Sequence, residues 1–252
     1  MVEKYFDINY PSYSIKAKIY CKDIHHFNKV VVSYHGFGGH KENRATARFA
    51  EHLIAKYKNF AVIIFDLPCH GEDVRKKLTL DDCDAYITMV NDYIKNRYKV
   101  EEIYAYGTSF GGYLLLKYID AHSNPFRKIV LRCPAIEIYY SLTSRIMEDG
   151  DFEKLAKGKE VEVGFDRKIK IVQSFLDELK EYDLMKLDFI DYADDLFIIQ
   201  GDKDEIVSPE IVNEFSENNV IDLLMVEGAD HRFKDPNKMD YAISEAIKFI
   251  VK

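Results

Sequence analysis

Residues 101–116 read EEIYAYGTSFGGYLLL. Residues 103–106 form a β-branched and aromatic run typical of a buried strand, and residues 113–119 form an apolar run typical of a buried helix. Between them, residues 107–111 match the pattern G-x-S-x-G, in which a serine occupies a strained turn from strand to helix. The stretch therefore predicts a strand, a sharp turn and a helix, with the hydroxyl of Ser109 projecting above a sheet.

The glycines on either side of the serine fit a crowded turn. With no Cβ, Gly107 and Gly111 let neighbouring backbone pass close to a turn that a larger side chain would block. Ser109 would stand at the start of a helix, where free backbone N–H groups favour developing negative charge. The G-x-S-x-G pattern fixes only three positions and also occurs by chance, because small residues are common in turns between a strand and a helix. The strand and helix patterns that flank it favour the functional interpretation.

Composition is that of an ordinary soluble globular domain. Of 252 residues, 47% are hydrophobic and 31% charged, and the length fits one α/β domain with an insertion better than two domains. No apolar run approaches membrane-spanning length and the first residues lack a secretory signal, so we expect a cytoplasmic protein without membrane insertion. The net charge of -8 disfavours nucleic acid and anionic lipid as main partners, because both repel a negative protein.

Cysteine usage indicates free thiols. The cysteines, which show neither C-x-x-C pairing nor metal-ligand spacing, are Cys21, Cys69, Cys83 and Cys133. We therefore expect a reducing compartment and no bound metal. Cys69 falls in a loop near the face that carries Ser109 and is a candidate reactive thiol; a small buried apolar residue is the alternative.

Strand and helix patterns alternate along most of the chain. An antiparallel hairpin at residues 5–10 and 15–20 is expected at a sheet edge. Further strands are expected at residues 29–34, 60–65, 128–133, 196–200 and 222–226, and helices near 49–57, 80–94, after 208 and after 235. This order predicts an α/β fold, with a mostly parallel central sheet and helices on both faces.

The alternation breaks between residues 136 and 188. This segment contains an acidic turn at residues 148–151, a short alternating run at 160–163 and an amphipathic helix expected from about 168 to 182. We interpret residues 136–188 as a small cap inserted above the sheet, so that residues 1–135 and 189–252 form the core.

Two later loops supply the partners that a nucleophilic serine needs. A serine hydroxyl becomes a good nucleophile when a base takes its proton, and a third group must hold that base in one tautomer. Residues 201–207 read GDKDEIV, and residues 227–233 read EGADHRF. With Ser109 they give the chain order Ser, Asp, His, which is the order of α/β-hydrolases and differs from the chymotrypsin and subtilisin folds.

Five motifs in sequence order resemble the α/β-hydrolase family over almost the whole chain. They lie at residues 35–39 (HGFGG), 66–71 (DLPCHG), 107–111 (GTSFG), 201–204 (GDKD) and 228–231 (GADH). The chain is most similar to small bacterial carboxylesterases, including the cinnamoyl (feruloyl) esterase and monoacylglycerol-lipase-like groups. The resemblance implies an α/β-hydrolase fold with Ser109 as nucleophile, Asp204 as acid and His231 as base, and no metal or organic cofactor.

Neighbouring residues compete for two of these roles. The family spacing of a glycine, two variable residues and an aspartate selects Asp204 over Asp202, which is expected to bond to its own turn backbone. Asp230 adjoins His231, yet neighbours in a turn point apart, so we expect a solvated or structural carboxylate. No other histidine falls in the loop that follows the last strand.

The oxyanion hole follows from the same resemblance. Acyl transfer makes a carbonyl oxygen tetrahedral and negative, and this oxygen needs preset hydrogen-bond donors. The resemblance implies the backbone N–H groups of Phe110, the residue after the nucleophile, and of Phe37 in an earlier loop. His35 is expected to orient that loop. Arg132, in a strand that should be buried, has no explanation from the sequence alone.

The sequence gives the weakest indication for the residues that bind the substrate. Aromatic side chains at Phe37, Phe110, Tyr139, Tyr140 and Phe165 could line an apolar acyl pocket, although most aromatic residues pack in cores or lids. No basic cluster in the cap marks a phosphate or carboxylate clamp. We therefore expect a small uncharged ester of a short, medium or aromatic acid; the oligomeric state is not encoded in any visible pattern.

These patterns predict a serine hydrolase that acts on carboxylic esters. Ser109 would form an acyl-enzyme, and water activated by His231 would release the acid. The same residues would serve an amidase of serine aminopeptidase type or an acyltransferase, since only recognition of the leaving group or acceptor differs. A non-catalytic binding module is the remaining alternative, although such proteins usually lose a member of the triad.

Overall fold

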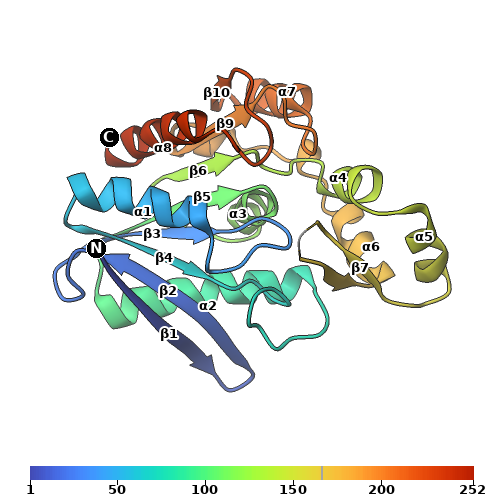
Figure 1. The fold of residues 1–252 in the computed structure, drawn as a ribbon, viewed down its shortest axis with the longest axis horizontal. Helices are drawn as coiled ribbons and strands as arrows, with labels where there is room; N and C mark the ends of the chain where they lie inside the picture. Colours follow the sequence, from blue (N-terminus) through green and yellow to red (C-terminus); the bar gives the residue numbers. More distant parts are fainter. Residues whose placement is uncertain (166) are drawn as a thin grey trace.

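An eight-stranded sheet forms the centre of the computed structural model, which describes residues 1–165 and 167–252 (Figure 1). The strands are β1 (Val2–Tyr10), β2 (Tyr13–Cys21), β3 (Lys29–Tyr34), β4 (Phe60–Phe65), β5 (Glu102–Thr108), β6 (Ile129–Arg132), β9 (Leu196–Gly201) and β10 (Asp222–Val226). Their order across the sheet is β1-β2-β4-β3-β5-β6-β9-β10. β2 pairs antiparallel with both β1 and β4, and all other neighbours are parallel. The predicted edge hairpin and mostly parallel sheet are confirmed.

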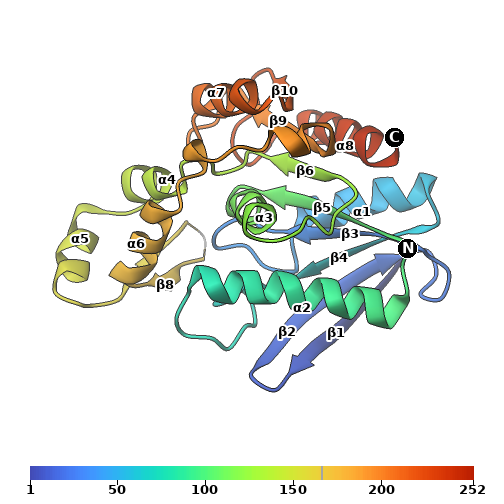
Figure 2. The same cartoon turned by 180° about the vertical axis from the view of Figure 1, so that it is seen from behind.

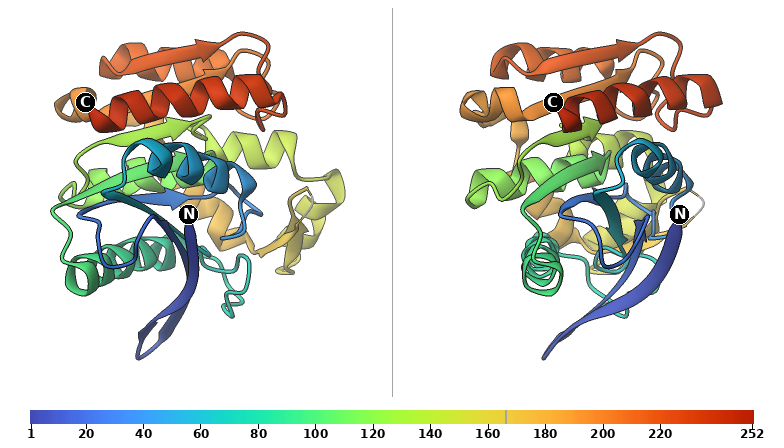
Figure 3. Two further views of the ribbon diagram at one scale, coloured as in Figure 1. Left: turned by 60° about the vertical axis from the view of Figure 1, so that its left-hand side comes forward. Right: turned by 90° about the vertical axis from the view of Figure 1, so that its left-hand side faces the viewer.

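Helices cover both faces of the sheet, as predicted. α1 (Arg44–Lys56) and α8 (Pro236–Val251) lie side by side on one face, while α2 (Leu80–Tyr98), α3 (Phe110–Ala121) and α7 (Pro209–Asn219) cover the other (Figure 2, Figure 3). Because both faces are covered, every residue of β4 is buried, which explains its unbroken apolar sequence.

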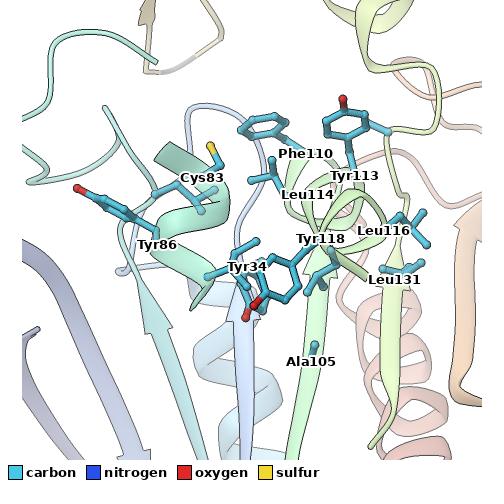
Figure 4. Packing of buried hydrophobic residues seen from close by; sticks show 14 of the residues in the cluster. Tyr34, Cys83, Tyr86, Ala105, Phe110, Tyr113, Leu114, Leu116, Tyr118 and Leu131 are labelled. Atoms are coloured by element: carbon cyan, nitrogen blue, oxygen red, sulfur yellow. The ribbon is translucent and has the colours of Figure 1, made fainter. Parts of the chain in front are cut away.

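The strand residues divide between two apolar layers by the period of two that a strand imposes. Val30 and Val32 point into the larger layer beneath α2 and α3, and Val31 points into the layer beneath α1 and α8. Figure 4 shows the larger layer around Phe110 and Leu114. All residues from Phe110 to Ile119 are buried, so the all-round apolar sequence of α3 reflects a central helix.

Helix starts follow the capping residues that the sequence offers. The Ser208 hydroxyl accepts a hydrogen bond from the Ile211 N–H at the start of α7, and the Asp235 carboxylate caps α8 in the same way. In both helices proline follows the cap, where its missing N–H costs no hydrogen bond. Both predicted helix starts are confirmed.

Residues 136–188 form elements that the sequence only partly indicated. They are α4 (Ile138–Arg145), α5 (Asp149–Ala156), β7 (Val161–Val163), β8 (Ile169–Ile171), α6 (Gln173–Glu181) and the 3-10 turn η1 (Leu184–Lys186). A second 3-10 turn, η2 (Ile190–Asp195), leads into β9. The prediction of a helix from about residue 168 is wrong: Ile169 and Ile171 are buried and pair with β7, so α6 begins later. The expected acidic turn is also wrong, because Glu148 and Asp151 form the capping box of α5.

This segment lies at one end of the sheet. β3, β5 and β6 point toward α4, α6 and β7 in Figure 1, so residues 136–165 and 167–188 sit beyond the carboxyl ends of the parallel strands. Ligands of open α/β sheets bind at this edge. Among the described residues, no helix has the length and apolar character that crossing a bilayer would require.

Candidate active site

Ser109 occupies the turn between β5 and α3 in a conformation that L-residues rarely adopt. Its φ is 52° and its ψ is -115°. Hydrogen bonds hold it there: its N–H donates to the Arg132 carbonyl at 3.0 Å, and its carbonyl accepts from the Gly112 and Tyr113 N–H groups at 2.9 and 3.1 Å. Such backbone strain costs about 1–3 kcal/mol and persists only where the surroundings over-determine it. The predicted strained turn is present.

The glycines of the motif make this turn possible. A Cβ on Gly111 would collide with the Tyr34 carbonyl oxygen, and one on Gly107 would lie 2.9 Å from the Gly111 oxygen. A Cβ on Gly36 would already lie 3.3 Å from the Ser109 Cβ. Because these three glycines have no Cβ, β3, the loop that follows it and α3 can approach one another closely around Ser109.

Gly111→Ala should destabilise the fold by about 3 kcal/mol or more, because the new methyl group meets fixed backbone instead of a flexible side chain. Gly150→Ala is the matched control, since a Cβ added at this position in α5 would meet nothing within 4 Å. That change should be neutral or stabilising by about 0.5–1 kcal/mol. Urea unfolding of both variants measures the difference, and equal midpoints would contradict the packing argument.

Three side chains distant in sequence meet beside this turn. His231, in the loop between β10 and α8, places Nε2 3.1 Å from Ser109 Oγ. Its Nδ1 lies 2.8 Å from Oδ2 of Asp204, which follows β9. The Asp204 side chain is fully buried, and that of His231 is 12% exposed. The predicted residues are thus linked in series, hydroxyl to imidazole to carboxylate.

Asp204 is held as an anion by a dense set of donors. Oδ1 accepts hydrogen bonds from the Ile206 and Val207 N–H groups at 2.9 and 2.8 Å, and Oδ2 accepts a further one from Gln200 Nε2 at 3.0 Å. Burial raises the pKa of the carboxyl, but the interaction with His231 and these backbone N–H groups outweigh it and hold the pKa below its ordinary value. The carboxylate is therefore charged at neutral pH.

Gln200 has a part in the site that the sequence did not reveal. Its side chain is fully buried at the end of β9, where the strand reads LFIIQG. An amide in an otherwise apolar buried strand was the available signal, because a buried polar group requires a partner.

The rival aspartates serve structural purposes. Asp202 accepts a hydrogen bond from the Gly228 N–H and so ties the acid loop to the histidine loop. The expectation that it bonds to its own turn is wrong, because its partner lies in the loop after β10. Asp230 accepts from the Lys234 N–H at 2.9 Å and pairs with the Lys234 ammonium, as expected for a structural carboxylate.

The backbone N–H groups assigned to the oxyanion hole are uncommitted. Within residues 1–165 and 167–252, neither the Phe37 nor the Phe110 N–H donates to any acceptor. The loop that carries Phe37 is fixed beside the serine, since Gly39 N–H donates to the Gly36 carbonyl at 2.9 Å. The rings of Phe37 and Phe110 also contact edge to face at 5.6 Å. The two donors thus belong to the first residue of α3 and to the loop after β3, which pack together beside Ser109.

Two buried histidines support this loop. His35 accepts a hydrogen bond at Nε2 from the Leu67 N–H at 3.2 Å, and its Nδ1 lies 2.9 Å from the Gly36 carbonyl oxygen, in line with the predicted orienting role. The His70 ring lies 5.2 Å from that of His35 and 5.6 Å from that of Phe37. Burial lowers the pKa of His70 to about 4 and that of His35 well below 6.5. Both rings are therefore neutral at physiological pH.

The His70 pKa predicts acid sensitivity. Between pH 6.5 and about 4, the unfolded chain binds a proton at His70 that the folded chain does not, so stability falls as the pH falls. From about pH 8 to about pH 5 the loss from this group should reach about 2 kcal/mol. In urea titrations His70→Gln should lose less stability over this interval than the wild type, whereas His25→Gln, at an exposed position, should match it. A His70 variant with unchanged pH dependence would contradict the prediction.

The aromatic residues suggested for the acyl pocket lie in different surroundings. Phe165 is 48% exposed, and its ring lies 5.3 Å from the guanidinium of Arg232, the neighbour of His231. Tyr139 is half-buried against the core, while Tyr140 is 52% exposed. Phe165 is therefore near the candidate site, and Tyr140 lies on the surface of α4.

One group of possible metal ligands overlaps the triad. Ligand atoms of Cys133, Asp204 and His231 lie within 4.8 Å of one another. Nδ1 of His231 already bonds to Asp204, and burial raises the pKa of the Cys133 thiol, which disfavours the thiolate that a metal needs. This arrangement fits a hydrogen-bonded network better than a metal site. All four cysteines are free, and burial raises the pKa of Cys69 to about 12, so Cys69 is not an activated thiol.

Comparisons with solved structures give the same fold. Est1E of Butyrivibrio proteoclasticus, solved with bound ferulic acid, is 19% identical with a TM-score of 0.77, over 98% of this chain and 100% of that one. The monoacylglycerol lipase of Paleococcus ferrophilus is 16% identical with a TM-score of 0.71, and the match covers 94% of this chain and 98% of the lipase chain. A serine hydrolase of Xanthomonas campestris, described as lacking a lid, is 15% identical with a TM-score of 0.65. The match covers 99% of this chain and 93% of the hydrolase chain. These likenesses confirm the α/β-hydrolase fold.

Sequence comparison gives the family. A search of curated proteins finds no match. The family model described as "Serine aminopeptidase, S33" matches residues 25–156, which is more than half of the chain and includes the turn at Ser109. The chain therefore belongs to this family of α/β-hydrolases.

Proposed function

We propose that the protein cleaves carboxylic esters of short, medium or aromatic acids, with Ser109 as nucleophile, His231 as general base and Asp204 as the orienting acid. The observation that carries the proposal is the series of contacts from Ser109 Oγ to His231 Nε2 at 3.1 Å and from His231 Nδ1 to Asp204 Oδ2 at 2.8 Å. Nucleophile, base and orienting acid must lie within this range for acyl transfer.

Acylation would begin with proton transfer from the Ser109 hydroxyl to His231 Nε2. Asp204 accepts a hydrogen bond from the Nδ1–H group of His231. This bond keeps Nε2 unprotonated, so that Nε2 acts as the base, and the carboxylate stabilises the imidazolium that forms. The negative oxygen of the tetrahedral intermediate would bind the free N–H groups of Phe37 and Phe110. His231 would then protonate the departing alcohol, and the acyl group would remain on Ser109.

Deacylation would repeat these steps with water. His231 takes a proton from a water molecule, whose oxygen attacks the acyl carbonyl, and the tetrahedral intermediate collapses to release the acid. The Ser109 oxygen regains its proton from His231. No step requires a group beyond the side chains and N–H groups described.

We propose that residues 136–188 act as a cap that bounds the acyl pocket. Phe175 of α6 meets the ring of Phe110 edge to face at 6.4 Å, which brings apolar surface of this segment to the residue beside the nucleophile. A Cβ on Gly38 would lie 2.8 Å from the Arg167 carbonyl oxygen, so the chain near β8 also contacts the loop of Phe37. Aromatic and apolar walls favour uncharged acyl groups.

A fluorophosphonate probe and an ester panel test this proposal. The wild type should be labelled at Ser109 and should hydrolyse p-nitrophenyl acetate, p-nitrophenyl butyrate and methyl ferulate. Absence of labelling would remove the hydrolase proposal in favour of a binding module. Hydrolysis of long-chain esters alone, with labelling retained, would overturn the substrate class and leave the mechanism intact.

The family description favours a second candidate, cleavage of an amide or peptide bond at an amino terminus. The same triad would perform it, because the acyl-enzyme chemistry is shared. Matched pairs of amino-acid p-nitroanilides and p-nitrophenyl esters separate the two. A kcat/KM for the anilides at or above that for the esters would favour the aminopeptidase.

A further inference from the structure

Arg132 places a guanidinium beneath the candidate triad. It is the last residue of β6, and it is only 4% exposed. Its Nη1 donates to the His231 carbonyl at 3.2 Å, and its Nη2 lies 3.5 Å from the Thr108 hydroxyl, next to Ser109. One side chain thus reaches both the loop of the base and the strand that ends at the nucleophile.

Nothing negative offsets this buried charge directly. Among the described residues no carboxylate forms an ion pair with Arg132, and its Nε has no hydrogen-bond partner. Its other contacts are the Phe233 ring, 5.3 Å from the guanidinium carbon, and the Tyr106 side chain, whose pKa is raised by burial, so it remains a neutral phenol. A buried unpaired charge is costly, and a residue kept for stability alone would be replaced by an apolar one at a gain.

We propose that Arg132 is a positioning residue for the proposed hydrolysis, because its guanidinium fixes the backbone of His231 relative to Ser109. The fork of the guanidinium provides two donors in one plane, which a lysine ammonium does not. Displacement of a catalytic group by about 1 Å costs on the order of 100-fold in rate. This inference rests on the function proposed above.

Two substitutions separate the tether from the charge. Arg132→Met removes both the tether and the charge and should lower kcat by about 10- to 100-fold, with KM changed by no more than about twofold. Arg132→Lys keeps the charge but not the fork, so kcat should fall in this variant as well. Arg127→Met is the matched control: it changes an exposed arginine just before β6, and its kinetics should equal those of the wild type.

The measurements are kcat and KM with p-nitrophenyl butyrate, with melting temperature recorded in parallel. A lower melting temperature with unchanged kcat in Arg132→Met would reduce Arg132 to a structural residue and overturn the inference. If Arg132→Met does not fold, an unchanged kcat in Arg132→Lys would overturn it equally. Failure of the proposed function is distinguishable, since the wild type itself would then neither hydrolyse the ester nor react with a fluorophosphonate.

Discussion

Ser109→Ala should lower kcat for ester hydrolysis by about a million-fold, because it removes the atom that forms the acyl-enzyme. A residual rate about 1,000-fold above that in water should remain, since the free N–H groups of Phe37 and Phe110 and the bound geometry are untouched. Steady-state hydrolysis of p-nitrophenyl butyrate and fluorophosphonate labelling measure the loss. A variant that retains more than about a hundredth of the activity would exclude Ser109 as the nucleophile.

Ser109→Gly provides a control that the turn geometry makes informative. Glycine adopts positive φ without a steric penalty, whereas Ser109 sits at 52°. Ser109→Gly should be as inactive as Ser109→Ala, yet more stable than it by about 1 kcal/mol or more in urea unfolding. Equal stabilities would show that the turn is not strained, without affecting the assignment of the nucleophile.

Asp204→Asn should lower kcat by about 10,000-fold while the fold is retained. The amide oxygen would take the place of Oδ1, which accepts the two backbone N–H groups of residues 206 and 207. The amide nitrogen would then face His231 Nδ1 and donate to it. This forces the tautomer with a proton on Nε2, which can no longer accept the Ser109 proton.

Gln200 decides how well the structure tolerates this variant. In the wild type its Nε2 donates to Asp204 at 3.0 Å and to the Gly201 and Val207 carbonyl oxygens at 3.3 and 3.4 Å. The new amide nitrogen would face this donor, and a half-turn of the Gln200 amide would turn Oε1 toward the two carbonyl oxygens. The substitution should therefore also lower the free energy of unfolding.

Asp202→Asn is the matched control for the acid. It makes the same chemical change two residues away, at a carboxylate that bonds to Gly228 N–H and does not contact His231. Its kcat should stay within about threefold of the wild type, as is usual for a residue outside the reacting groups. The kcat/KM of both variants is measured with one ester. Loss of activity in Asp202→Asn with retention in Asp204→Asn would reverse the assignment of the acid.

The strands and the residues of the triad were predictable because each leaves a local sequence signature. The limits of β3, β4 and β10 match the predicted runs. β3 and β4 are almost entirely buried, and a buried parallel strand reads as an apolar stretch ended by a polar turn. β10 lies at the edge of the sheet with only Val226 buried, and its aliphatic run before a polar turn marked it. Chain order then places Ser109, Asp204 and His231 after parallel strands, whose carboxyl ends share one edge of the sheet. The parallel arrangement of the strands therefore predicted that the three side chains lie close together, which local sequence patterns alone do not.

The residues between β6 and β9 were poorly predicted for a physical reason. Ile169 and Ile171 alternate with lysines over too few residues to distinguish a short strand from the start of an amphipathic helix. Their strand conformation depends on pairing with Val161 and Val163 in a two-stranded sheet. The role of Arg132 was likewise not predictable, because its partners, His231 and Thr108, lie far from it in the sequence and become visible only in three dimensions. Gln200 did leave a signal, an amide in an apolar strand, but its partner Asp204 is identified only by the structure.

The parallel pairing of β6 with β9 leaves the connection between them largely unconstrained by the sheet. Parallel neighbours need a crossover of only about a dozen residues. Residues 133–195 stand between these strands, and lengthening such a connection adds little closure entropy. This stretch is consequently a natural place for exchange. A segment grafted here from another member of the fold should leave Ser109, Asp204 and His231 in place, because all three follow strands that lie outside the graft.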